Sequence, residues 1–60
     1  MIQAYIDAAS RCYPQKKWDV RPAYNKQGRQ VGYRVGINGD YGDRILSEDD
    51  LRSATRDFNR

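Results

Sequence analysis

The stretch QVGYRVGING, residues 30–39, decides the fold of this chain. Its apolar residues alternate with small or polar ones, and the apolar set is Val31, Tyr33, Val35 and Ile37. Successive side chains of a strand point to opposite faces, so this alternation predicts a strand with one apolar face. Asn38-Gly39 follows, and this dipeptide favours a tight turn because both residues tolerate positive φ. The stretch therefore predicts a central strand that ends in a hairpin.

Strands are also expected on both sides of this central one. Residues 18–25, WDVRPAYN, alternate in the same way, and Pro22 predicts an edge strand because proline cannot donate a ladder hydrogen bond. The polar residues 25–30, NKQGRQ, predict a loop that turns at Gly28. After the Asn38-Gly39 turn, residues 41–46 are expected to add a short third strand.

Two amphipathic helices flank these strands. Apolar residues between Ile2 and Tyr13 recur at helical spacing, and Pro14 stops the pattern, which predicts a helix over residues 2–13. Ser47 and Asp50 have the spacing of a capping box, which predicts the start of a second helix.

Further signals support the start of the second helix. Leu46 and Leu51 occupy the positions of a hydrophobic staple. Acidic residues at 48–50 place negative charge at the positive end of the helix dipole. The apolar stripe of this helix is Leu51, Ala54, Thr55 and Phe58.

These elements predict one α+β domain over residues 1–60, in the order helix, three antiparallel strands, helix (αβββα). A sheet with one apolar face needs a cover. We expect both helices to pack on that face, which leaves the other face of the sheet open to solvent or to a partner.

Composition argues against catalysis and against a cofactor. The chain has no histidine, so the usual proton shuttle is missing, and its single cysteine, Cys12, cannot form an intrachain disulfide or a structural zinc site. Cys12 lies on the apolar stripe of the first helix, which predicts a buried, inert thiol. Asp40 and Asp43 lack the further oxygen ligands of a calcium loop, so a plain turn is expected there. We therefore expect a non-enzymatic protein without a metal site.

Charge and hydropathy indicate the compartment and the kinds of partner. No run of apolar residues is long enough to cross a membrane, and the N-terminus does not resemble a signal peptide. Together with the lack of disulfides, this predicts a cytoplasmic protein without a membrane partner. The net charge of +3 permits binding to nucleic acid without requiring it.

The open face of the sheet is the candidate binding surface. Strand parity sends Arg21 and Arg34 away from the helices, and Arg44 joins them if Ile45 points inward. Gly32 and Gly36 share this parity, which predicts a flat floor between the arginines.

Loop residues and tyrosines extend this surface. Lys26 and Arg29 lie in the hairpin loop, where they enlarge the basic area. Tyr24 and Tyr41 lie near loops and are candidates for stacking on a base or anchoring a protein interface. Two plainer alternatives remain: arginines on open sheet faces are often only solvated, and aromatic residues at strand ends often pack on the sheet edge.

Three coarse resemblances bear on these alternatives. The order helix, three strands, helix resembles that of double-stranded-RNA-binding domains, and Lys26 and Arg29 lie in the loop with which that family contacts RNA. The family's lysine cluster at the last helix is replaced here by residues 47–50, SEDD. Trp18 opens the first strand as in small HicA-type toxins, but the histidine of their ribonuclease site is missing. Residues 18–37 faintly resemble the three-stranded arm-binding modules of phage integrases.

The expected function is therefore a nucleic-acid-binding module, with DNA or RNA bound at the basic open face. The alternative is an inhibitor or adaptor that binds an acidic protein surface, of the kind that phages and mobile elements use against host enzymes. A homodimer is a further possibility, because a chain of 60 residues has a thin core that a partner subunit can extend.

Overall fold

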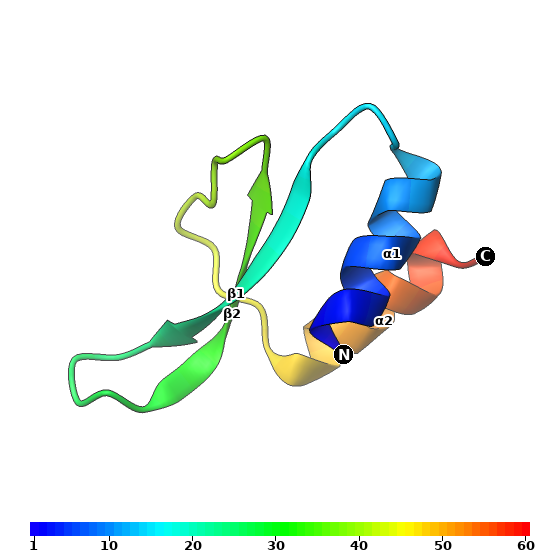
Figure 1. The fold of residues 1–60 in the computed structure, drawn as a ribbon. Helices are drawn as coiled ribbons and strands as arrows, with labels where there is room; N and C mark the ends of the chain where they lie inside the picture. The colour runs from blue at the N-terminus through cyan, green and yellow to red at the C-terminus, as the bar shows by residue number, and fades with distance from the viewer.

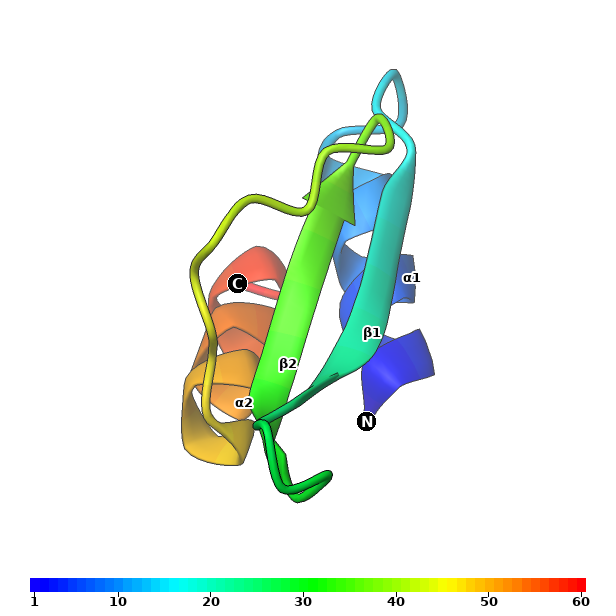
Figure 2. The same ribbon diagram turned by 90° about the vertical axis from the view of Figure 1, so that its left-hand side faces the viewer.

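The computed structural model describes residues 1–60 and has an α+β architecture (Figure 1). The elements in chain order are α1 (Ile2–Cys12), β1 (Trp18–Tyr24), β2 (Gln30–Ile37) and α2 (Glu48–Phe58). The strands form one antiparallel hairpin, and both helices lie behind the same face of it (Figure 2). No helix is long and apolar enough to span a membrane.

The prediction of a three-stranded sheet is wrong, because the sheet contains only β1 and β2. Residues 41–46 return along β2 but touch its ladder only through isolated bridges, Ile37 with Asp40 and Tyr33 with Leu46. Between these bridges the returning segment advances six residues while β2 advances four. The two surplus residues force the segment to bulge away from the ladder, so no third strand forms.

The turn that precedes this segment is the expected one. Asn38 and Gly39 have φ values of 55° and 88°, and Ile37 pairs with Asp40 across them. The side-chain oxygen of Asn38 also accepts a hydrogen bond of 2.9 Å from the backbone N–H of Lys17. This bond ties the turn to the start of β1.

The register of the hairpin slips near its loop. Trp18 pairs with Ile37 and Ala23 with Gly32, but Tyr24 pairs with Gln30, so Val31 has no partner. An extra residue of this kind increases the local twist and redirects neighbouring side chains. The hairpin loop reaches away from the helices (Figure 1).

The start of α2 forms as its sequence predicts. The Ser47 hydroxyl accepts the backbone N–H of Asp50 at 3.1 Å, and the Asp50 carboxylate accepts the N–H of Ser47 at 3.4 Å. This capping box satisfies donors that would otherwise be unpaired at the helix end. Leu51, one turn further on, is fully buried.

The core lies between the hairpin and the helices and is small. Its buried cluster consists of Tyr5, Ala9, Val20 and Leu51. Beside it, the rings of Tyr5 and Trp18 both meet Phe58 edge to face, at centroid distances of 5.5 and 5.8 Å. Edge-to-face contacts add to the stability that burial provides.

Cys12 differs from its prediction. Cys12 is the last residue of α1 and is exposed. Its thiol donates a hydrogen bond of 3.0 Å to the carbonyl oxygen of Phe58. The last buried residues of α1 are Ala8 and Ala9, and Cys12 lies about one turn beyond them at the end of the helix, outside the small core. The expectation of a buried thiol is therefore wrong.

Candidate binding site on the outer face of the hairpin

Arg21 and Arg34 lie side by side on the face of the hairpin opposite to the helices. The two residues are direct partners in the register of β1 and β2. Directly opposed residues of an antiparallel pair point to the same face. Their neighbours Val20 and Val35 pack with the core on the other side. We call the face that carries Arg21 and Arg34 the arginine face.

Arg21 is held in place by two neighbours on this face. Its Nε lies 3.4 Å from the Oδ2 atom of Asp19, and its guanidinium lies over the Tyr41 ring, 4.8 Å from the centroid. The Tyr41 hydroxyl in turn donates a hydrogen bond to the same carboxylate oxygen of Asp19. Asp19, Arg21 and Tyr41 thus form one connected group that orients the Arg21 side chain.

Arg34 has no such partner. The three ion pairs of the structure involve Arg21, Arg52 and Arg60, and no side-chain hydrogen bond is made by Arg34. Arg34 is half-buried, and its guanidinium donors, which are not paired within the protein, are able to bind an anionic group.

The predicted flat floor of glycines is wrong, because the returning segment covers both positions. A Cβ atom on Gly36 would lie 2.6 Å from the Tyr41 ring. A Cβ atom on Gly32 would lie 2.7 Å from Ile45 Cγ2 and against the carbonyl oxygen of Leu46. Figure 1 shows this segment, in yellow, on the side of the sheet opposite to the helices. The glycines make room for this cover and not for a ligand.

A hollow remains beside this cover. It has a volume of about 390 Å³ and is lined by Arg21, Pro22, Ala23, Tyr24, Arg34 and Tyr41. We call it the Tyr24 hollow. Tyr24 shares the parity of the core-facing residues of β1, yet it lines this hollow, next to the slip in register. Its side chain is 61% exposed, more than any other large apolar residue of the chain.

The remaining residues of the predicted surface lie elsewhere. Lys26 and Arg29 lie in the hairpin loop, whose backbone is held by hydrogen bonds to the Asn25 side chain. Arg44 lines a separate hollow of about 220 Å³ beside core residues such as Tyr5 and Leu46. The structure thus brings Arg21, Arg34, Tyr24 and Tyr41 together, with Lys26 and Arg29 beyond them and Arg44 apart.

Sequence reasoning missed Asp19, although its parity places it on the arginine face. It pairs with Gly36, two positions from Arg21 along β1, and it is the only acidic residue of β1 or β2. The signal was available, because residues two apart on a strand share a face. Asp19 offsets part of the charge of Arg21 and anchors Tyr41.

Charge is unevenly distributed along the chain. Residues 8–38 contain seven Lys or Arg and one Asp, a net charge of +6, whereas residues 39–60 contain four Arg and six Asp or Glu, a net charge of −2. With the one Asp of residues 1–7, these values sum to +3. Three of the seven cations, Arg11, Lys16 and Lys17, precede the hairpin, and the hairpin itself, residues 18–37, carries four Lys or Arg and one Asp, a net charge of +3. The hairpin is therefore a positively charged surface within the chain.

The hydrogen bond between Asp19 and Tyr41 shifts both of their pKa values. The Tyr41 hydroxyl stabilises the carboxylate, which lowers the pKa of Asp19, and the same bond raises the pKa of Tyr41. The contribution of Asp19 to stability is therefore present above its ordinary pKa and is lost as the pH falls through the lowered value. The contribution of Tyr41 to stability is present below the ordinary pKa of tyrosine, and it is lost as the pH rises through the raised pKa of Tyr41.

We expect Tyr41→Phe to return the pKa of Asp19 toward its ordinary value, because the donor that stabilises the carboxylate is removed. A carbon-detected NMR titration of the Asp19 carboxyl group measures this directly. Tyr24→Phe is the control, since it also removes a tyrosine hydroxyl, while the hydroxyl that donates to Asp19 belongs to Tyr41. An unchanged Asp19 titration in Tyr41→Phe would show that the hydrogen bond does not form in solution.

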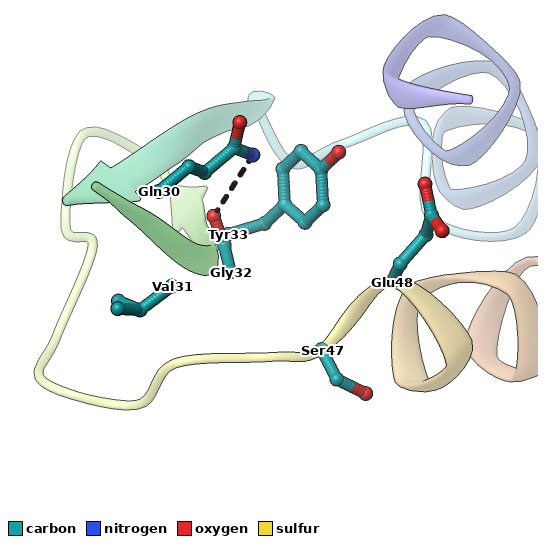
Figure 3. Close-up of a pocket in the computed structure, with 6 residues that line it drawn as sticks. All are labelled: Gln30, Val31, Gly32, Tyr33, Ser47 and Glu48. Atoms are coloured by element: carbon teal, nitrogen blue, oxygen red, sulfur yellow. Dashed lines mark hydrogen bonds between the residues drawn. The ribbon is translucent and has the colours of Figure 1, made fainter.

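Another hollow, of about 310 Å³, lies between β2 and the start of α2 and is lined by Gln30, Val31, Gly32, Tyr33, Ser47 and Glu48 (Figure 3). The Ser47 hydroxyl in this hollow belongs to the capping box of α2. The side-chain amide of Gln30 donates a hydrogen bond of 3.3 Å to the backbone carbonyl oxygen of Gly32. No group of three or more Cys, Asp or Glu side chains is placed to hold a metal ion. The polar groups of Ser47 and Gln30 thus serve local structure.

Comparison with known proteins finds no relative of this chain. No protein-family model, curated protein or solved structure matches the chain. The geometry of its own residues therefore carries the functional assignment.

Proposed function

We propose that this protein is a non-enzymatic nucleic-acid-binding module that contacts phosphate groups through its hairpin. The observation that carries the proposal is the direct pairing of Arg21 with Arg34 on the face away from the helices. Arginine forks bind phosphate oxygens with paired donors, and phosphate contacts supply most of the affinity of such proteins.

The hairpin loop supports this proposal. Lys26 and Arg29 continue the positive charge of the arginine face beyond the strands, where the loop reaches away from the body of the molecule (Figure 1). The hydrogen bonds of Asn25 to the N–H groups of Gln27 and Arg29 hold the loop in one shape. A cationic, preorganised arm loses little entropy when it meets an extended anionic backbone.

We expect the affinity for nucleic acid to fall steeply with salt. Four neutralised phosphates, one for each of Arg21, Arg34, Lys26 and Arg29, give a log–log slope of about −3.6 on duplex DNA and about −2.8 on a single strand. Arg21→Ala/Arg34→Ala should weaken binding and lower the magnitude of the slope by about 1.4 to 2, as measured by fluorescence anisotropy across salt concentrations.

Arg52→Ala/Arg56→Ala is the matched control, because it removes the same charge from α2 on the other side of the molecule. It should change the slope far less than the variant of the arginine face. A flat salt response of the unaltered protein, or no binding at low salt, would end the proposal.

A second candidate is an inhibitor or adaptor that binds an acidic protein surface through the same face. Tyrosine and arginine are the residue types that dominate protein interfaces, and Tyr24 is largely exposed beside Arg21 and Arg34. A pull-down with and without nuclease treatment separates the two candidates. Protein capture that survives nuclease, in a chain without affinity for DNA or RNA, favours the second.

A further inference from the structure

The geometry points to a single-stranded nucleic acid as the occupant of the Tyr24 hollow, with one base stacked on Tyr24 and its phosphate bound by Arg34. This inference rests on the proposed function and specifies its ligand. It is carried by the shape of the arginine face, by the exposure of Tyr24 and by the different surroundings of the two arginines.

The shape of the face disfavours a duplex. A two-stranded ribbon can enter the major groove of DNA when one of its faces is free to approach the base edges. Here the Tyr41 ring lies on Gly36 and Ile45 lies against Gly32, so side chains of the returning segment cover two positions of β2 on this face. Beside these side chains lies the Tyr24 hollow, and a hollow suits one unstacked nucleotide better than a rigid double helix.

The exposure of Tyr24 indicates a stacking platform. At 61% exposure it is the least buried of the large apolar side chains, and its ring makes none of the aromatic contacts found among Tyr5, Tyr13, Trp18 and Phe58. Bases that are not paired in a helix stack on exposed aromatic rings with little regard to sequence. Tyr24 is the lining residue whose ring is free for this contact.

Arg21 and Arg34 have different surroundings in the hollow and therefore different roles in binding a phosphate. Arg21 is oriented by Asp19 and by the Tyr41 ring, and Asp19 offsets part of its charge, so Arg21 is the weaker of the two phosphate contacts. Arg34, directly opposite and half-buried, has no ion-pair partner, and it lines the hollow, where its guanidinium is available to a phosphate. A stacking ring next to a cationic backbone contact is the combination that single-strand-binding surfaces use.

The test compares four ligands of equal length: oligo(dT), oligo(U), an abasic deoxyribose-phosphate strand and a DNA duplex. We expect either oligo(dT) or oligo(U), or both, to bind about 5- to 150-fold more tightly than the abasic strand, the range that one stacked base provides. The duplex should also bind more weakly than the better single strand. The comparison of oligo(dT) with oligo(U) distinguishes DNA from RNA.

Variants of Tyr24 assign the effect to its ring. Tyr24→Leu should remove most of the preference for base-bearing strands and leave abasic binding unchanged, whereas Tyr24→Phe should keep the preference. Because the side chain is largely exposed, circular dichroism should show both variants folded.

The outcomes separate this inference from the proposed function. Equal binding of the abasic strand, tighter binding of the duplex or an unchanged preference in Tyr24→Leu overturns the inference, while salt-dependent binding still supports a nucleic-acid-binding module. Absence of binding to all four ligands at low salt overturns both.

Discussion

Replacing Leu51 by alanine is expected to remove a large share of the protein's stability. Leu51 is the one large side chain that is fully buried, and it joins α2 to Tyr5 and Ala9 of α1 and to Val20 of β1. Leucine-to-alanine changes at such sites cost about 2–5 kcal/mol, through lost burial and the cavity that remains. A chain of this length has about 3–9 kcal/mol of stability in total.

Thermal unfolding followed by circular dichroism measures this effect. For a domain of this size each kcal/mol lowers Tm by about 4–8 °C, so Leu51→Ala should lower Tm by at least about 8 °C. Val31→Ala is the control, because Val31 is 45% exposed and unpaired at the slip in register. A loss in Leu51→Ala no larger than in Val31→Ala would show that the core does not centre on Leu51.

The second large effect is expected for Gly32→Ala. Gly32 has a φ of +156°, and a Cβ atom there would lie against the carbonyl oxygen of Leu46, a backbone atom, and 2.7 Å from Ile45 Cγ2. Backbone strain in this region costs about 1–3 kcal/mol, and forcing atoms into a filled space costs about 1–3 kcal/mol more. The total is about 2–6 kcal/mol, comparable to the loss of a core side chain.

Gly28→Ala separates the two contributions to this cost. Gly28 also has positive φ, +81°, but no atom lies within 4 Å of the position of its Cβ, so only the backbone cost applies. Denaturant unfolding should therefore rank Gly32→Ala as the more destabilised variant. Equal losses of stability in the two variants would show that the returning segment does not press on Gly32.

Amide hydrogen exchange measures locally whether Gly32→Ala displaces the returning segment. Tyr33 and Leu46 exchange reciprocal backbone hydrogen bonds of 2.8 Å, which hold the returning segment against β2. Gly32→Ala should push Leu46 away and accelerate exchange at both amides. Gly28→Ala should leave them protected, because the hairpin loop is remote from this bridge.

The candidate site could be predicted only in part. Period-two alternation places Arg21 and Arg34 on the face away from the core, because each alternates with core-facing residues of its own strand, Val20 and Val35. The position of Tyr24 in the hollow, in contrast, accompanies a slip in register that leaves Val31 unpaired, and alternation alone cannot reveal such a slip. Arg44 depended on a third strand that does not form, and it lines a different hollow.

Local chemistry in the sequence determined the helices, the hairpin and the turn at Asn38-Gly39. Each depends on residues close together in the chain: apolar periodicity, the Ser47 capping box and tolerance of positive φ. The tertiary structure alone decided what becomes of residues 40–46. Tyr41, Ile45 and Leu46 favour a strand there. The Leu46 bridge to Tyr33 nevertheless leaves two residues too many for a ladder, and Tyr41 contacts Asp19 and Gly36 on the outer face. A segment satisfies its backbone and side chains against whatever surface the rest of the fold presents, and that surface exists only after folding.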